Sequence, residues 1–403
     1  MAKKGDSSAR VDYLLAVVVA ALVVIGLVMV YSASYYLGYM EYGKPLYFLV
    51  RQALWAVLGS GALWAMMRLE YHIWQRYSVL IMGTTLFLLA VLLFVGSQRF
   101  GGQRWFLAGS IQPSELAKLA VIIYIANWLS SRGEQIHQVT YGLIPFAIII
   151  GLVTGLILLQ PDFSTAILVS ATAFAMFFLA GAELRQLAIS GLIGALVIGL
   201  LLLQAPYRME RVLDFWDPLR DPVGRDYQVL GAVSALNDGG WLGVGLGRGE
   251  HKYGPVFLWH SDTIFSVLGE ELGLISCLVV IGLFAVLSYR GFRIGQRAPD
   301  PFGMLLAAGI TCWLTLQALI NMAATTATVP FTGITLPFIS FGGSSLITSL
   351  AGIGLLLSIS RSVQKAGGQR ASVDFGWRER RARLSRPRRA GRGTIRGAGS
   401  GRT

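Results

Sequence analysis

Three carboxylates lie where the longest polar loop of a very apolar chain meets a run of membrane length: Asp262, Glu270 and Glu271. A carboxylate on or at the edge of a membrane span is costly and is usually functional. Asp262 precedes Glu270 by eight residues, about two helical turns, so we expect these two to share a helix face while Glu271 is rotated away. Asp262 also fits an ordinary N-cap of the helix that follows, and the stretch alone leaves both interpretations open.

A charged pair, Glu115 and Lys118, lies near the start of another apolar run. Side chains three residues apart on a helix share a face, so these two can form an ion pair. The positive N-terminal end of a helix dipole favours glutamate, which accounts for Glu115 without a functional role. The same argument explains Lys118 less well, because this residue lies a turn deeper in the apolar run.

Two further places interrupt the apolar pattern. Asp162 follows a Gln-Pro pair in a hairpin too short to reach far into water, where it either caps the next helix or contributes to a site. A Gly-Gly-Ser-Ser run at 342–345, with Ser344 and Ser345, begins the last apolar segment. Glycine and serine permit either tight packing of small residues or a broken helix, which is tolerated at membrane depth only beside protein or a wet cavity.

All four places fall toward the outer side of the membrane topology that the distribution of Lys and Arg predicts. Ionisable residues inside membranes face the bundle interior and pair with one another, so we expect one polar cavity on that side. No His-Glu-x-x-His motif and no Cys/His cluster occurs, which argues against a zinc enzyme. The glycine-rich run at 239–247 lacks the lysine of a phosphate-binding loop and is better suited to lie flat on a membrane surface.

The composition is that of an integral membrane protein. The chain has 403 residues, of which 54% are hydrophobic and 14% charged. The net charge of +13 does not indicate a nucleic-acid partner, because much of it is concentrated in the last forty-odd residues. Cys277 and Cys312 both lie inside apolar runs, so we expect neither a disulfide nor a cysteine-bound metal.

Ten segments are long and apolar enough to cross a bilayer, a crossing that needs about 20 residues. They are residues 13–33, 47–67, 78–96, 115–130, 140–159, 163–181, 187–204, 263–289, 303–325 and 338–359. The sequence therefore predicts an all-α integral membrane protein of ten transmembrane helices. A large extracellular loop, residues 204–261, is expected between the seventh and eighth helices.

The distribution of Lys and Arg predicts the orientation. Thirteen Lys and Arg residues occur from Arg361 onward, and most of the short connections on the same side are also basic. The positive-inside rule and the even number of spans place both termini in the cytoplasm and the large loop outside. The expected organisation is a cytoplasmic N-terminus (1–12), a membrane domain (13–361) and a basic, disordered cytoplasmic tail (362–403) that either attracts anionic lipid headgroups or docks a regulator.

Five motifs occur in order along the chain. They are Met-Val-Tyr-Ser-Ala-Ser at 29–34, Gln-Pro-Ser-Glu-Leu-Ala-Lys at 112–118, Gln-Pro-Asp at 160–162, His-Ser-Asp at 260–262 with Gly-Glu-Glu-Leu-Gly at 269–273, and Leu-Pro-Phe-Ile-Ser-Phe-Gly-Gly-Ser-Ser at 336–345. Together they resemble the SEDS family (shape, elongation, division and sporulation), which includes the bacterial FtsW and RodA proteins. The resemblance runs from about residue 12 to residue 361 and favours the FtsW type. The sequence departs from the family in the lead-in to His260 and at Phe341, where tyrosine is usual.

The resemblance implies a peptidoglycan glycosyltransferase that polymerises lipid II on the outer face of the bacterial cytoplasmic membrane. It also implies a partner, a class B penicillin-binding protein that crosslinks the new strands. Asp262 matches the family's essential loop aspartate, the expected catalytic base. The polar residues expected to line the substrate cavity are Glu115, Lys118, Asp162, Ser344 and its neighbour Ser345.

The implied reaction converts an α-linked donor into a β-linked product, so one direct displacement with inversion and one general base are expected. The leaving pyrophosphate needs positive charge. Candidates are a divalent cation (Mg²⁺ or Mn²⁺) or the side chains of Arg104, Lys118, Arg208 and Arg211. No other cofactor is expected.

Two other functional classes stay open. Discontinuous helices around a polar cavity also describe a transporter, such as a flippase for a lipid-linked precursor. A noncatalytic scaffold that recruits the transpeptidase is the third possibility, although it leaves the buried charges without a role. The expected binding partners of the glycosyltransferase include lipid II and membrane lipids, and no nucleic acid.

Overall fold

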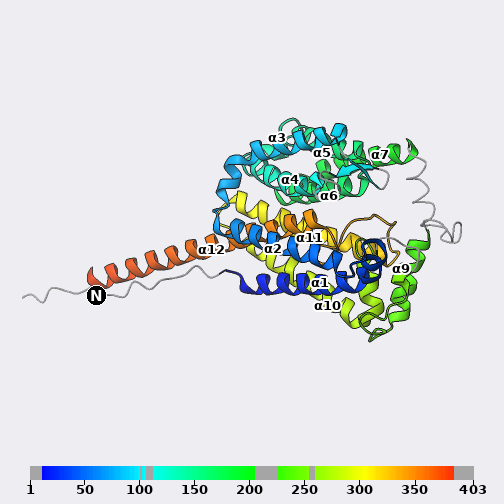
Figure 1. Ribbon diagram of the computed structural model, residues 1–403. Coiled ribbons are helices and arrows are strands. Elements are labelled where there is room, and N and C mark those ends of the chain that lie inside the picture. The colour runs from blue at the N-terminus through cyan, green and yellow to red at the C-terminus, as the bar shows by residue number, and fades with distance from the viewer. Residues whose placement is uncertain are drawn as a thin grey trace, which may run out of the picture.

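The structure, a computed structural model, describes residues 11–95, 97–99, 102–105, 112–204, 226–253 and 259–384. Helices form in all ten segments predicted to cross a bilayer (Figure 1). They are α1 (Tyr13–Tyr42), α2 (Tyr47–Arg68), α3 (His72–Val95), α4 (Pro113–Ser130), α5 (Ile144–Leu159), α6 (Phe163–Leu179), α7 (Leu184–Gln204), α10 (Ile264–Gln296), α11 (Pro301–Thr325) and α12 (Gly343–Leu384). In the described part of the chain, seven helical spans are long and apolar enough to cross a membrane, so the count of ten crossings stays a prediction.

Short elements complete the all-helical fold. Strands β1 (Ser97–Arg99) and β2 (Gly102–Trp105) pair as an antiparallel hairpin between α3 and α4, which the sequence analysis did not predict. The predicted large loop contains α9 (Asp226–Gly239) and a short 3-10 turn, η4 (His251–Tyr253). Between α4 and α5 lie two more short elements, η2 (Gly133–His137) and η3 (Val139–Leu143).

The helices form two groups that meet at the centre of the bundle (Figure 1). Helices α3 to α7 make one group, and α1, α2, α10, α11 and α12 make the other. Helix α11 packs against both α4 and α6, and α12 packs against α4, so these contacts join the groups. The apolar parts of α11 and α12 are the most buried of the seven candidate spans.

Glycines bring the backbones of α2 and α12 close together. A Cβ atom on Gly354 would lie 2.5 Å from the Leu63 carbonyl oxygen, and one on Gly343 would lie 2.5 Å from the Trp55 ring. Small residues at a helix interface in lipid permit this close approach, which maximises van der Waals contact where no hydrophobic effect drives association. Gly343 and Gly354 are therefore used in packing at this interface.

Several boundaries differ from the predicted ones; α1, for example, ends at Tyr42 and not at residue 33. The last apolar segment was predicted from residue 338, but α12 begins at Gly343. The same helix continues to Leu384, so it extends into the segment 362–403 that the sequence analysis expected to be a disordered tail. Extending an existing helix needs no new nucleation, and the Arg, Ala, Gln and Glu residues of this stretch are good helix formers. Residues 385–403 lie outside the described part.

Non-helical backbone enters the bundle in two places. Helix α10 is interrupted at Gly273, whose φ of 78° and ψ of 179° break the helical hydrogen bonding. Between α11 and α12, residues 332–341 are extended or bent; we call them the α11–α12 linker. By contrast, the predicted tight turn at 160–162 is confirmed, because α5 ends at Leu159 and α6 begins at Phe163.

Replacing Gly354 by alanine tests the α2–α12 packing. The added methyl group meets the backbone of α2, so we expect Gly354→Ala to lower the free energy of unfolding by about 1–3 kcal/mol. Gly61→Ala is the matched control, since nothing lies within 4 Å of a Cβ atom at Gly61. Thermal unfolding in detergent should show a lower midpoint for the first variant alone; equal midpoints would contradict the packing argument.

Candidate functional site

The α11–α12 linker is held by side chains from three helices. Four of its backbone carbonyl oxygens accept hydrogen bonds from α2, α6 and α11. The donor and acceptor residues are Ser164 and Thr332, Asn321 and Ile334 (2.7 Å), Gln317 and Thr335 (3.0 Å), and Gln52 and Ser340 (3.1 Å). Irregular backbone at membrane depth requires such partners, because no bulk water is available to replace them.

Asp262 lies beside this linker. The Asn321 side-chain amide, which binds the linker, also donates to the Asp262 carbonyl oxygen at 2.8 Å. One carboxylate oxygen of Asp262 accepts a hydrogen bond from the Ser261 hydroxyl at 2.6 Å. The other faces Gly333, where a Cβ atom would lie only 3.3 Å away. Gly333 has a φ of 68°, a backbone conformation that glycine adopts without strain.

The structure rejects the N-cap interpretation of Asp262. Helix α10 begins at Ile264, and its N-cap residue is Thr263. Asp262 therefore precedes the helix, and the expectation that it shares a helix face with Glu270 is wrong. The carboxylate instead accepts a hydrogen bond from the Ser261 hydroxyl and lies against Gly333 of the linker.

A second set of contacts aligns the loop before α10 with the end of the linker. The Phe341 N–H donates to the His260 carbonyl at 2.9 Å, and the Ser340 hydroxyl donates to the Ser261 carbonyl at 2.6 Å. The His260 ring lies 4.7 Å from the Phe48 ring and 5.3 Å from the Phe341 ring, measured between centroids. Burial lowers the pKa of His260 to about 4, so the ring is neutral at pH 7 and contributes packing, not charge.

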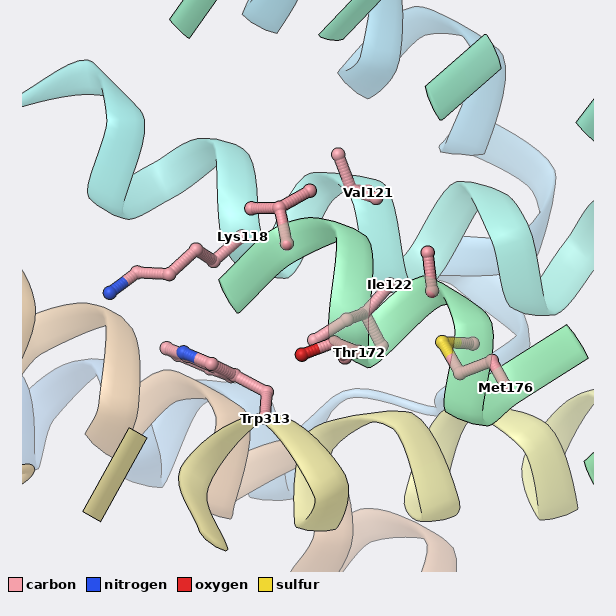
Figure 2. Close-up of a pocket in the computed structure, with 8 residues that line it drawn as sticks. Lys118, Val121, Ile122, Thr172, Met176 and Trp313 are labelled. Atoms are coloured by element: carbon pink, nitrogen blue, oxygen red, sulfur yellow. The ribbon is translucent and has the colours of Figure 1, made fainter. Parts of the chain in front are cut away.

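Lys118 is connected to the linker through one amide. Its ammonium group lies 2.8 Å from Glu115 Oε2, which confirms the predicted ion pair, and donates to Gln317 Oε1 at 2.9 Å. Gln317 in turn donates to Thr335 of the linker. Figure 2 shows Lys118 extending past Trp313 at one end of a small cavity between α4, α6 and α11. The cavity has a volume of about 10 Å³, close to that needed by one water molecule.

Asp162 joins α6 to the start of α4. Its carboxylate accepts from Gln112 Nε2 at 3.1 Å and from the Ser114 hydroxyl at 3.2 Å. It also accepts from the Thr165 N–H at 3.3 Å, so Asp162 is both a helix cap and a member of the polar network. The Gln112 N–H lies 3.3 Å from the Ser344 hydroxyl oxygen, which brings the start of α12 into the same network.

The predicted site residues fall into three sets. Glu115 and Lys118 reach the linker through Gln317, and Ser345 reaches it directly, with its hydroxyl 3.2 Å from that of Thr335. Asp162 and Ser344 meet at Gln112. For the three arginines the prediction is untested: only the backbone of Arg104 is described, in β2, and Arg208 and Arg211 lie outside the described residues.

Glu270 and Glu271 bind the large loop. Glu271 accepts hydrogen bonds from the Ser32 hydroxyl at 2.6 Å and from the Lys252 ammonium group at 2.7 Å. Glu270 accepts from the His251 N–H at 3.2 Å, and its carboxylate lies 3.1 Å from a His251 ring nitrogen. These carboxylates fasten η4 and its neighbours to α1 and α10.

Sequence reasoning missed three amides that hold the linker: Gln52, Gln317 and Asn321. All three are buried. Gln317 and Asn321 are four residues apart inside an apolar span, so they lie on one helix face. Uncharged polar side chains inside a membrane span hydrogen-bond across helices, and this spacing was a usable signal.

The described residues contain no group of three or more His, Cys, Asp or Glu side chains placed to hold a metal ion. Among these residues, Asp262 supplies an oriented carboxylate next to a buried polar network. A hydroxyl group brought to that carboxylate could lose its proton to it.

Comparison with known proteins places this arrangement in a family. The family model for FtsW, RodA and SpoVE, described as a cell cycle protein, matches residues 12–365. A relative from Trichlorobacter lovleyi, named probable peptidoglycan glycosyltransferase FtsW, is 37% identical over 89% of this chain and 95% of its own.

Two solved structures share the fold. One is a chain from work described as "Structural coordination of polymerization and crosslinking by a peptidoglycan synthase complex", with a TM-score of 0.73 and 31% identity over 88% of this chain and 98% of the other. The other is the rod shape determining protein RodA of Thermus thermophilus, with a TM-score of 0.66 and 29% identity over 87% of this chain and 97% of the other. The chain therefore belongs to the FtsW/RodA/SpoVE family of multi-pass membrane proteins.

Proposed function

We propose that the protein is a peptidoglycan glycosyltransferase that polymerises lipid II, with Asp262 as the general base. The observation that carries this proposal is the position of Asp262: one buried amide, Asn321, binds both its backbone and the linker. The names of the relatives support the same activity. We favour the FtsW type, and so a role in cell division, because several similar relatives carry that name at 37–38% identity; a relative named stage V sporulation protein E is equally similar at 38%.

The proposed topology has ten transmembrane helices with both termini in the cytoplasm and the large loop outside. Helix α10 begins beside Asp262 and ends at Gln296, next to the basic residues Arg293 and Arg297. The positive-inside rule assigns the basic end to the cytoplasm. Asp262 then lies at the outer face of the bacterial cytoplasmic membrane, where a sugar can reach it while its lipid stays in the bilayer.

In the proposed reaction, Asp262 removes the proton from the acceptor's 4-hydroxyl group as that oxygen attacks the donor's anomeric carbon. The bond from this carbon to the polyprenyl pyrophosphate breaks in the same step, so the configuration inverts. The Ser261 hydroxyl and Asn321 hold the base in place before substrate binds. A base that is already oriented lowers the barrier without reorganising during the reaction.

We assign Lys118 to positioning, because its charge is paired with Glu115 and it binds the linker through Gln317. Arg104, Arg208 and Arg211 then remain as the candidates for binding the pyrophosphate, which a guanidinium group can bind bidentately. A Mg²⁺ or Mn²⁺ ion is a further proposal; when bound, it would offset the negative charge of the leaving pyrophosphate. No step above depends on the ion.

We also propose a class B penicillin-binding protein as the partner that crosslinks the product. The support is the fold shared with a chain of a peptidoglycan synthase complex in which polymerisation and crosslinking are coordinated. Lipid II and membrane lipids are the remaining partners of the proposal.

Asp262→Asn tests the base directly. The amide keeps the size of the side chain and can still accept from the Ser261 hydroxyl through its oxygen, but it cannot take up the proton, so polymerisation should fall by about 100-fold or more. The assay follows glycan chains formed from lipid II by the purified protein with its transpeptidase partner. Asp238→Asn is the control, since Asp238 is an exposed carboxylate on α9. Near-normal polymerisation by Asp262→Asn would remove Asp262 from the role.

Paired substitutions separate the structural and functional roles of Lys118. Lys118→Met leaves Glu115 buried and unpaired, so we expect a loss of about 3–5 kcal/mol in the free energy of unfolding. Adding Glu115→Gln should restore most of the thermal stability. If Lys118 positions the linker, the double variant stays impaired in polymerisation; full recovery of activity would restrict the pair to stability.

A further inference from the structure

An uncharged loop after α9 exposes large apolar side chains. It comprises residues 240–246, Gly-Trp-Leu-Gly-Val-Gly-Leu, which we call the glycine loop. Trp241 is 70% exposed, Leu242 79% and Leu246 50%. A contiguous apolar surface of this kind on a loop marks contact with another apolar phase or partner.

The glycine loop is bonded to α10 at the break in that helix. The Leu274 N–H donates to the Gly240 carbonyl at 2.9 Å, and the Val244 N–H donates to the Glu270 carbonyl at 3.0 Å. These are backbone groups that the Gly273 turn leaves without helical partners. A Cβ atom on Gly273 would lie 2.4 Å from the Trp241 carbonyl oxygen, so the loop and the helix are in direct backbone contact. Trp241 is therefore level with the first turn of α10 after the break.

Two polar clusters provide a scale for membrane depth. At one end, Arg290 of α10 lies 2.7 Å from Asp12, the N-cap residue of α1. At the other end, the Ser32 hydroxyl of α1 binds Glu271 of α10. From one cluster to the other the continuous helix α1 advances about 20 residues, which corresponds to about 30 Å; α10 covers the same distance in about 19 residues, with its break at the Glu271 end. This is the thickness of the hydrocarbon core, so the two clusters bracket it.

The break in α10 then lies just inside the hydrocarbon. Leu274 and Ile275 follow Glu271 by three and four residues, or about 4–6 Å toward the membrane centre. Both are exposed on the bundle surface, as is Leu278 one turn further. The glycine loop continues this apolar surface, because its backbone is bonded to the same turn.

We propose that the glycine loop inserts into the bilayer at the Asp262 end of the bundle, with Leu242 among the acyl chains and Trp241 at the interface. Tryptophan is enriched at this depth because its ring is apolar while its N–H can reach water and headgroups. In the proposed topology this is the outer leaflet. The inference does not depend on the proposed activity, since it rests on the helix lengths and the loop contacts alone.

Insertion would hold part of the large loop at the membrane surface. The same loop leads into Lys252, whose ammonium group binds Glu271 and the Gly247 carbonyl at 2.9 Å. Lipid contact at the glycine loop and the ion pair at Lys252 therefore fix this part of the loop to the membrane surface. Lipid is the occupant that the depth scale favours; a protein partner on the same surface is an outcome that the experiment separates.

Spin-label accessibility in vesicles tests the insertion. The full-length protein, with Cys277 and Cys312 replaced by alanine, carries one nitroxide at Leu242→Cys and is reconstituted in phosphatidylcholine–phosphatidylglycerol vesicles without any partner. Leu278→Cys serves as the lipid-facing reference. Ser234→Cys is the water-facing reference, since Ser234 is exposed on α9. Leu246→Cys replaces Leu242→Cys if the latter does not fold.

The expected result is that the label at Leu242 collides with oxygen as often as the label at Leu278. Its collisions with a water-soluble nickel chelate should be several-fold fewer than those at Ser234. Equal nickel accessibility at Leu242 and Ser234 would show that the loop lies in water and would overturn the proposal. Protection from both reagents would also overturn it, because a protein surface, such as a second copy of this chain, would then cover the loop.

Discussion

The structure depends on the requirement that buried backbone outside a helix must be hydrogen-bonded. The α11–α12 linker runs through the bundle where water cannot serve as partner, and each of its bonds to Gln52, Ser164, Gln317 and Asn321 comes from a helix. Because α2 and α6 are far from the linker in sequence, the linker can form all of its bonds only when these helices are packed correctly against α11. Asp262 shares one of the same donors, so its position depends on the whole arrangement.

The buried charges divide into two pairs with different consequences. Glu115 and Lys118 lie in the bundle interior and connect to the linker, whereas Lys252 and Glu271 fasten the large loop to α10. Neither pair adds much to the free energy of unfolding, since the cost of desolvating two charges offsets much of their attraction. Both pairs fix geometry. The Glu115–Lys118 pair orders the bundle interior next to the linker, and the Lys252–Glu271 pair orders the large loop near the membrane surface.

The sequence predicted what is encoded locally. Apolar runs of membrane length gave the ten helical segments, the Gln-Pro-Asp turn gave the hairpin, and the three-residue spacing gave the Glu115–Lys118 pair. It failed where partners are distant in the chain: Glu271 binds Ser32 and Lys252, and no periodicity carries that information. The linker was interpreted only as a Gly/Ser interruption, because its hydrogen bonds to α2, α6 and α11 exist only in the folded bundle. Asp262 was nevertheless identified, because the five motifs in order resemble the SEDS family and Asp262 matches the essential loop aspartate of that family.

The most direct test of this account is hydrogen exchange of the linker together with polymerisation in Asn321→Ala, compared with Thr326→Ala at the exposed end of α11. Loss of the Asn321 amide removes its bonds to both Ile334 and Asp262. We predict faster amide exchange in residues 332–341, including the Phe341 N–H, and polymerisation reduced by about 10-fold or more, with neither change in the control. Wild-type polymerisation in Asn321→Ala despite faster linker exchange would contradict the claim that the linker positions Asp262.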